Sequence, residues 1–124
     1  MIDHVSIGTR DLQRALDFYT ACLAPLGYTV QHQDPTLAVF GADGNWSFIA
    51  YPAQDDSPLQ GHRAHIAFSA PSKEAAQAFH AKAIELGAQT LREPGLRPDV
   101  NERYYGAIIT DPDQHMIEVV HWMS

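Results

Sequence analysis

The sequence predicts an α+β protein built from two similar halves. In each half an amphipathic segment with helical spacing follows one short alternating strand and precedes three more strands. Corresponding residues recur at an offset of 61 positions in the first strand and the helix, where His4 matches His65 and Phe18 matches Phe79. Neither half could bury a sheet face alone. We therefore expect the two βαβββ halves to pair across a shared concave surface.

The first half begins with an alternating strand, Ile2 to Gly8. Asp11 is placed to cap the helix that follows, and the apolar stripe of that helix ends at Leu23, shortly before Pro25 and Gly27. Turn residues then separate three further predicted strands. The first two begin with 29–31 and 37–40, and the third spans 46–51.

The second half repeats this order from a strand at 63–69. Pro71 and Ser72 open its helix, which ends at Gly87, and the later predicted strands are 89–91, 104–110 and 116–122. The segment 38–40 matches 107–109 at an offset of 69, which places the extra residues in a loop over 92–102. The prediction is one domain, 1–124, with module one at about 1–52, a linker at 53–61 and module two at about 62–124.

The closing strand carries an unusual charge. Glu118 lies between Ile117 and Val119, in a strand that should be largely buried, and a buried carboxylate must be paired, hydrogen-bonded or bound to a metal. An Asp111-Pro112-Asp113 turn precedes this strand, with Pro112 fixing one φ angle and Asp113 tolerating the unusual dihedrals that follow.

Two histidines are candidate partners for Glu118. His4 and His65 occupy equivalent positions of the repeat, on the strand face opposite the large apolar residues, and each is followed two positions later by a small residue. Two histidines and one carboxylate are the donors of a common open metal site, which leaves coordination positions free for a substrate. The sequence therefore predicts that His4, His65 and Glu118 bind a divalent metal ion.

The repeat, these three residues and the Asp111-Pro112-Asp113 turn together resemble the vicinal oxygen chelate superfamily. This superfamily includes glyoxalase I, extradiol dioxygenases, fosfomycin-resistance proteins and bleomycin-resistance proteins. The resemblance implies paired βαβββ modules forming a half-barrel around a concave cavity, a homodimer, and a divalent metal (zinc, nickel, manganese or iron) at His4, His65 and Glu118. It implies a lyase, isomerase or dioxygenase acting on a small oxygen-rich substrate. The alternative is a metal-free binding protein of the bleomycin-resistance type.

One position departs from the glyoxalase I pattern. Relatives of that enzyme usually place a carboxylate or a glutamine in the last strand of the first half. The 69-residue offset aligns Glu118 with Ile49, and the segment 46–51 contains neither a carboxylate nor an amide. A three-ligand site is more similar to those of the dioxygenases and fosfomycin-modifying enzymes.

Two neighbouring tyrosines are further candidates for catalytic roles beside Glu118. Tyr104 or Tyr105 could line the cavity and hydrogen-bond an oxyanion or a substrate carbonyl, or both could be ordinary strand aromatics. Adjacent strand residues point to opposite faces, so only one of them faces the cavity, and the pattern does not choose. Arg63, Arg97 and Arg103 are candidates for pairing with an anionic substrate or are simply surface residues. We expect His115 to be exposed in its turn, His121 to face away from Glu118, and His32, His62 and His80 not to bind metal.

Composition limits the classes of partner. The net charge of -7, from 8 basic and 15 acidic residues, argues against a nucleic-acid or anionic-membrane surface. No apolar run approaches the roughly 20 residues that span a bilayer, and Asp3 and His4 are unlike a signal peptide. Cys22 is the only cysteine, so we expect a reducing, cytoplasmic setting with Cys22 as a buried apolar side chain. The expected partners are a small-molecule substrate and a second copy of the chain.

Overall fold

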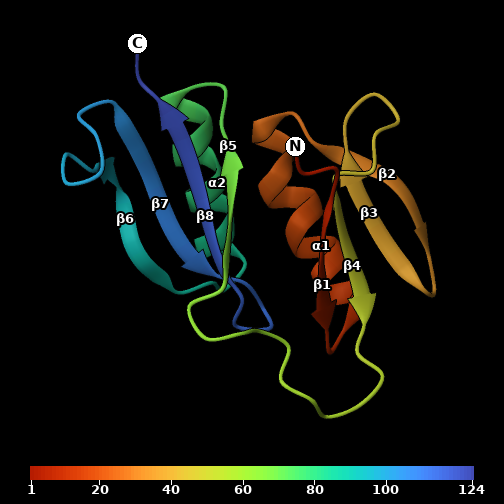
Figure 1. The fold of residues 1–124 in the computed structure, drawn as a ribbon. Helices are drawn as coiled ribbons and strands as arrows, with labels where there is room; N and C mark the ends of the chain where they lie inside the picture. The colour runs from red at the N-terminus through yellow and green to blue at the C-terminus, as the bar shows by residue number, and fades with distance from the viewer.

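The computed structural model describes residues 1–124 and contains two modules with the same order of elements, as Figure 1 shows. Module one consists of β1 (Val5–Thr9), α1 (Leu12–Leu23), the short 3-10 helix η1 (Ala24–Leu26), β2 (Thr29–Asp34), β3 (Leu37–Gly41) and β4 (Phe48–Pro52). Module two consists of β5 (His65–Ser69), α2 (Lys73–Glu85), β6 (Thr90–Leu96), β7 (Tyr104–Thr110) and β8 (Met116–Trp122).

Each module forms its own four-stranded sheet. The strand order is β1-β4-β3-β2 in module one and β5-β8-β7-β6 in module two, so the first strand of each module lies at a sheet edge, parallel to the last strand of that module. Both sheets are open and neither closes into a barrel. The predicted α+β class with two βαβββ modules is confirmed, and open sheets are what half-barrel modules require.

The helix boundaries follow the predicted capping residues. The side chain of Asp11 accepts a hydrogen bond from the Arg14 N–H, and the side chain of Ser72 accepts one from the Ala75 N–H. Gly27 follows η1 and turns the chain into β2. Its φ of 90° lies in the left-handed region, where any residue with a side chain would be strained. Neither helix is long and apolar enough to cross a membrane.

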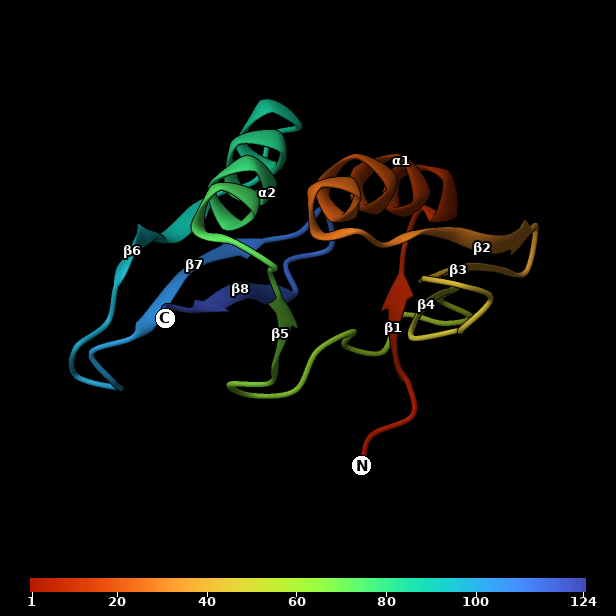
Figure 2. The same ribbon diagram turned by 90° about the horizontal axis from the view of Figure 1, so that it is seen from above.

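The two modules share one apolar core. Helices α1 and α2 pack against each other and lie on the same side of the two sheets (Figure 2). The ring of Phe48 in β4 meets that of Phe68 in β5 edge-on, with centroids 5.1 Å apart. Phe68 in turn packs against Phe79 of α2, so the aromatic side chains continue from one module into the other. The modules therefore form one packed unit.

The strand registers agree with the offsets read from the sequence. Ser6 of β1 pairs with Ile49 of β4, and Ala67 of β5 pairs with Glu118 of β8. These are the partners that offsets of 61 and 69 residues predict. Ile49 therefore occupies the place in module one that Glu118 occupies in module two.

The prediction of a loop over 92–102 is wrong for its first part, because β6 continues to Leu96. Pro94 lies within this strand. It is tolerated there because β6 is the edge strand of its sheet and its pairing with β7 shifts register between Arg92 and Gly95. The prediction that β4 begins at Trp46 also differs from the structure, in which the strand begins at Phe48.

The turn between β7 and β8 differs from the prediction in two ways. The residue with a positive φ is Gln114, at 69°, rather than Asp113. His115 is buried, with 5 % of its surface exposed, because its Nε2 atom lies 2.7 Å from the Gly8 carbonyl oxygen in module one. The prediction that His115 is exposed is wrong, since the turn packs onto the other module instead of projecting into solvent.

Candidate functional site

The alternation of β8 places Glu118 on the outer face of its sheet, meaning the face turned away from the helices. Its neighbours Ile117 and Val119 belong to the apolar core on the helix side, as the sequence predicts. Glu118 is nevertheless only 6 % exposed. A carboxylate so far removed from water needs polar partners, and two side chains of module two provide them.

The first of these side chains is His65, at the start of β5. Its Nε2 atom lies 3.7 Å from Oε2 of Glu118, which is too far for a hydrogen bond. Its other ring nitrogen, Nδ1, donates to the Arg63 carbonyl oxygen at 3.2 Å. A carbonyl oxygen can only accept, so in the neutral ring the proton is on Nδ1 and Nε2 carries a lone pair. Arg63 has a left-handed φ of 60°, a conformation that a residue with a side chain adopts at some energetic cost.

The second side chain is Tyr104, at the start of β7. Its hydroxyl donates to Oε1 of Glu118 at 2.6 Å, so the two carboxylate oxygens have different roles and Oε2 is the one that faces His65. Burial, followed by the hydrogen bond and charge of Glu118, raises the pKa of Tyr104 to about 12. Tyr105 points to the helix side, where its hydroxyl accepts a hydrogen bond from Gln77. The structure thus makes the choice that the sequence left open.

A glycine next to this pair leaves room for it. Gly106 lies two positions after Tyr104 on the same strand face. A Cβ atom there would approach the Val119 carbonyl oxygen to 2.6 Å and would lie 3.7 Å from both Oε1 of Glu118 and the Tyr104 ring. A larger residue at 106 would therefore displace β8 where it carries Glu118.

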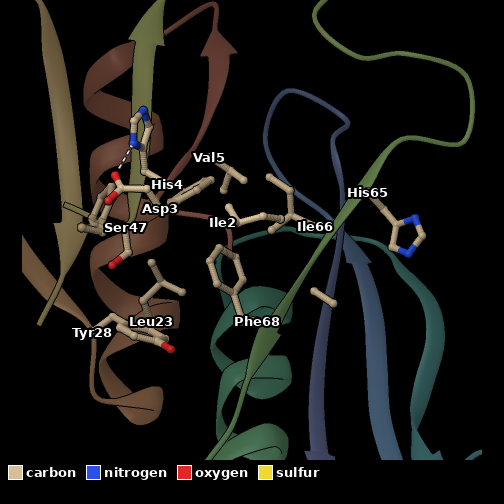
Figure 3. A pocket seen from close by; sticks show the side chains of 13 residues that line it. Ile2, Asp3, His4, Val5, Leu23, Tyr28, Ser47, His65, Ile66 and Phe68 are labelled. Atoms are coloured by element: carbon tan, nitrogen blue, oxygen red, sulfur yellow. Dashed lines mark hydrogen bonds and ion pairs between the residues drawn. The ribbon is translucent and has the colours of Figure 1, made fainter. Parts of the chain in front are cut away.

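His4 lies apart from His65 and Glu118. It directly precedes β1, is exposed, and has Nδ1 2.6 Å from a carboxylate oxygen of Asp3. Figure 3 shows His4 and His65 on opposite sides of a cavity of about 420 Å³ between β1 and β5, with apolar side chains such as Val5, Ile66 and Phe68 lining it. No three His, Cys, Asp or Glu side chains within the chain form a cluster able to hold a metal ion. The structure thus brings together two of the three predicted ligands.

The sequence of residues 1–119 matches the model of the Glyoxalase/Bleomycin resistance protein/Dioxygenase superfamily. The chain belongs to this superfamily. The superfamily contains metal-using enzymes as well as bleomycin-resistance proteins that are not enzymes, and its members bind small molecules and often form dimers. A comparison with curated protein sequences found no match.

Several solved structures of the superfamily are similar to this chain. A glyoxalase/bleomycin resistance protein from Albidiferax ferrireducens T118 is 30 % identical over 98 % of both chains, with a TM-score of 0.86. A glyoxalase/bleomycin resistance protein/dioxygenase family enzyme from Burkholderia phytofirmans PsJN is 19 % identical over 98 % of both chains, with a TM-score of 0.74. The V278E mutant of glyoxalase I from Zea mays is 24 % identical over 95 % of this chain and 44 % of that chain, with a TM-score of 0.72. The last two comparisons show a shared fold alone.

Ile49 is the position at which this member departs from the glyoxalase I pattern. It lies on the outer face of the first sheet, paired with Ser6 and Val39, and is 5 % exposed. Its alkyl side chain offers no atom that can bind a metal. Module one therefore presents His4 alone where module two presents His65 and Glu118.

Three further histidines have partners away from Glu118. His121 Nδ1 lies 2.9 Å from the Ala70 carbonyl oxygen, His80 Nε2 lies 2.8 Å from the Thr90 hydroxyl, and His32 pairs with Asp34 and stacks on Trp46.

Sequence reasoning missed that β6 carries arginine on the same outer face as Glu118. The signal was hidden because Pro94 and Gly95 suggested a loop, whereas the continued strand gives Arg92 a defined place and brings Arg97, just beyond its end, opposite Tyr104.

Proposed function

We propose that this protein is a divalent-metal enzyme acting on a small oxygen-rich molecule, of the lyase, isomerase or dioxygenase type found in its superfamily. His65 and Glu118 would supply two ligands, and His4 of a second copy would supply the third. The observation that carries the proposal is the pairing of Nε2 of His65 with Oε2 of Glu118, which face each other at 3.7 Å without a hydrogen bond.

The donor set fits a divalent first-row metal. The neutral imidazole of His65 has its lone pair on Nε2, because Nδ1 donates to the Arg63 carbonyl. A hydrogen-bonded second nitrogen is the usual arrangement around a metal-binding histidine. Glu118 keeps Oε2 free of hydrogen bonds while Oε1 accepts one from Tyr104. Nitrogen and carboxylate oxygen together suit zinc, nickel, manganese and iron.

A metal ion bound there would act as a Lewis acid on the vicinal oxygen atoms of the substrate. The chain's own residues would position the ligands. Tyr104 holds the Glu118 carboxylate in one orientation, and the Arg63 carbonyl holds the His65 ring. Burial of Glu118 keeps water away from that carboxylate.

The proposed homodimer follows from the separation of His4 from the other two ligands. His4 belongs to module one, whereas His65 and Glu118 belong to module two. A two-fold pair of chains that sets module one of one copy against module two of the other would form two equivalent sites. Large apolar side chains that are half exposed support such a contact, and they occur in both modules: Trp46, Tyr51 and Trp122.

A metal-free protein that sequesters a small molecule is the alternative. Ile49 favours it, because this side chain removes the ligand that glyoxalase I relatives carry at that position. The two functions differ in whether metal binds at all.

Metal content of the purified protein tests the proposal. After incubation with Zn²⁺ and removal of free metal, atomic emission should find bound zinc in the wild type and in His62→Ala, which serves as a matched control because His62 is an exposed histidine shortly before β5. His65→Ala should lose the metal while keeping its circular dichroism spectrum. If the wild type bound no metal after separate incubations with Zn²⁺, Ni²⁺, Mn²⁺ and Fe²⁺, the enzyme proposal would be refuted and the binding protein favoured.

A further inference from the structure

Arginine residues extend the outer face of the second sheet beyond Glu118. Glu118 of β8 pairs with Ile108 of β7, which pairs with Arg92 of β6, so these three residues form a row across three strands. At the end of β6 the Arg97 N–H donates to the Tyr104 carbonyl oxygen at 2.8 Å, which places Arg97 opposite Tyr104. Arg97 and Tyr104 therefore share one strand-pair position next to the candidate site.

The Arg97 side chain is held in place but keeps hydrogen-bonding capacity. Its Nε and Nη2 atoms donate to the two carboxylate oxygens of Asp99, at 3.2 and 2.6 Å, and Nη1 makes no hydrogen bond. The side chain is 21 % exposed. The pKa of Arg97 is raised chiefly by the hydrogen bonds to Asp99, and the charges of Glu118 and Tyr104 raise it further. The guanidinium thus lies within electrostatic reach of the Tyr104–Glu118 pair.

Three of the basic residues of the chain lie close together in the sequence near this location. The protein has a net charge of -7 and only 8 Lys and Arg residues, of which three lie between positions 92 and 103: Arg92, Arg97 and Arg103. Arg97 pairs with Asp99, whereas Arg92 and Arg103 form no ion pair within the chain. Glu93, Asp99 and Glu102 lie in the same segment, so it carries no net charge, and what distinguishes Arg97 is its position beside Tyr104.

We propose that Arg97 binds an anionic group, a carboxylate or phosphate, at the end of the substrate remote from His65 and Glu118. This inference rests on the proposed function, because it assigns the substrate class of the same site. Strands β6 and β8 are two positions apart in the sheet, and Arg97 lies opposite Tyr104, four residues along β7 from the Ile108 that pairs with Glu118. The substrate would therefore be a small molecule with vicinal oxygens at one end and an anionic group at the other. A planar guanidinium fork suits such a group better than lysine would.

Two matched probes test the inference. Dihydrocaffeate carries two vicinal hydroxyls and a distant carboxylate, and dihydrocaffeamide replaces the carboxylate with a neutral amide. Calorimetric titration of each probe, with and without Zn²⁺, should show at least about tenfold tighter binding of the anionic probe to the wild type. In Arg97→Gln the preference should fall below about threefold, while Arg14→Gln, on the exposed surface of α1, should keep the wild-type value.

A second variant separates recognition from structural support. Asp99→Asn removes the carboxylate that neutralises the guanidinium, so it should bind dihydrocaffeate more tightly than the wild type does. If the ion pair between Arg97 and Asp99 only supported the local structure, Arg97→Gln and Asp99→Asn would weaken binding of dihydrocaffeate alike. Equal affinities of the two probes for the wild type, no binding of dihydrocaffeate, or a preference unchanged in Arg97→Gln would each overturn the inference. Failure of the proposed function is seen separately, as a wild type that binds none of Zn²⁺, Ni²⁺, Mn²⁺ and Fe²⁺ in the absence of probes.

Discussion

The hydroxyl of Tyr19 in α1 donates a hydrogen bond to Oδ2 of Asp111, 92 residues away in the turn between β7 and β8. Oδ1 of Asp111 accepts the N–H groups of Asp113 and His115 in the same turn. The Asp113 carboxylate in turn accepts hydrogen bonds from the hydroxyl of Thr9, at the end of β1, and from the backbone N–H of Arg10. One turn of module two is therefore attached to both the helix and the first strand of module one.

Tyr19→Phe should destabilise the protein by about 1–3 kcal/mol, because it removes a donor from a buried carboxylate without giving the carboxylate access to water. Urea unfolding followed by fluorescence measures the change. Tyr28→Phe is the matched control, since Tyr28 is half-buried and its hydroxyl makes no hydrogen bond within the chain, and the substitution should change stability by less than about 0.5 kcal/mol. Equal effects of the two substitutions would contradict the role assigned to Asp111.

The pH dependence of stability should identify Asp111. Burial raises the pKa of Asp111 in the folded protein, against the lowering effect of its hydrogen bonds. The folded state therefore binds this proton more tightly than the unfolded state, and stability falls as pH rises from the unfolded pKa of about 3.9 through the folded pKa. Asp111→Asn lacks this titration. Unfolding measured from acidic to neutral pH should show the stability difference moving in favour of the asparagine variant as pH rises, and a shift in the opposite direction would be inconsistent with a raised pKa.

Tyr104→Phe should weaken Zn²⁺ binding by about 10- to 100-fold, because the hydroxyl that orients Glu118 is lost while both ligands remain. Competition with a chelator of known affinity measures the change. Tyr105→Phe removes a hydroxyl from the helix side of the same strand and should leave Zn²⁺ binding unchanged. If both variants bound zinc as the wild type does, Tyr104 would have no part in the site.

Mixing two inactive variants tests whether the site is shared between copies. His4→Ala and Glu118→Ala should each bind no zinc as pure proteins. After unfolding and refolding together in equal amounts, mixed dimers would each contain one intact site, giving roughly a quarter of the wild-type metal content. Recovery of no metal, in a sample shown to contain dimers, would exclude a site built from two chains.

Local features of the sequence correctly predicted most of the fold. Asp11 and Ser72 cap the helices through an N–H only three residues further along the chain, so the contact depends on the local backbone conformation and not on distant residues. The alternation around Glu118 assigned that residue to the outer face, because successive strand residues point to opposite sides. The repeat offsets predicted that Ile49 and Glu118 occupy equivalent registers, and the pairing confirms this.

Features that depend on distant neighbours were not predicted. His115 is buried because Gly8, which is 107 residues away, offers it a carbonyl oxygen. β6 continues through Pro94 because it lies at a sheet edge, and sheet order cannot be read from the strand itself. The side chain of Arg97 acquires its place beside Tyr104 only once β6 is extended.

The sequence by itself determined the two βαβββ modules, the helix caps and the face on which Glu118 lies, since each depends on spacing along a few residues. The tertiary structure alone decided which tyrosine meets Glu118, which histidine faces it, and that His4 lies on the far side of the cavity between the modules. Those outcomes depend on how the two modules pack through a shared core. No local pattern contains the geometry of that packing.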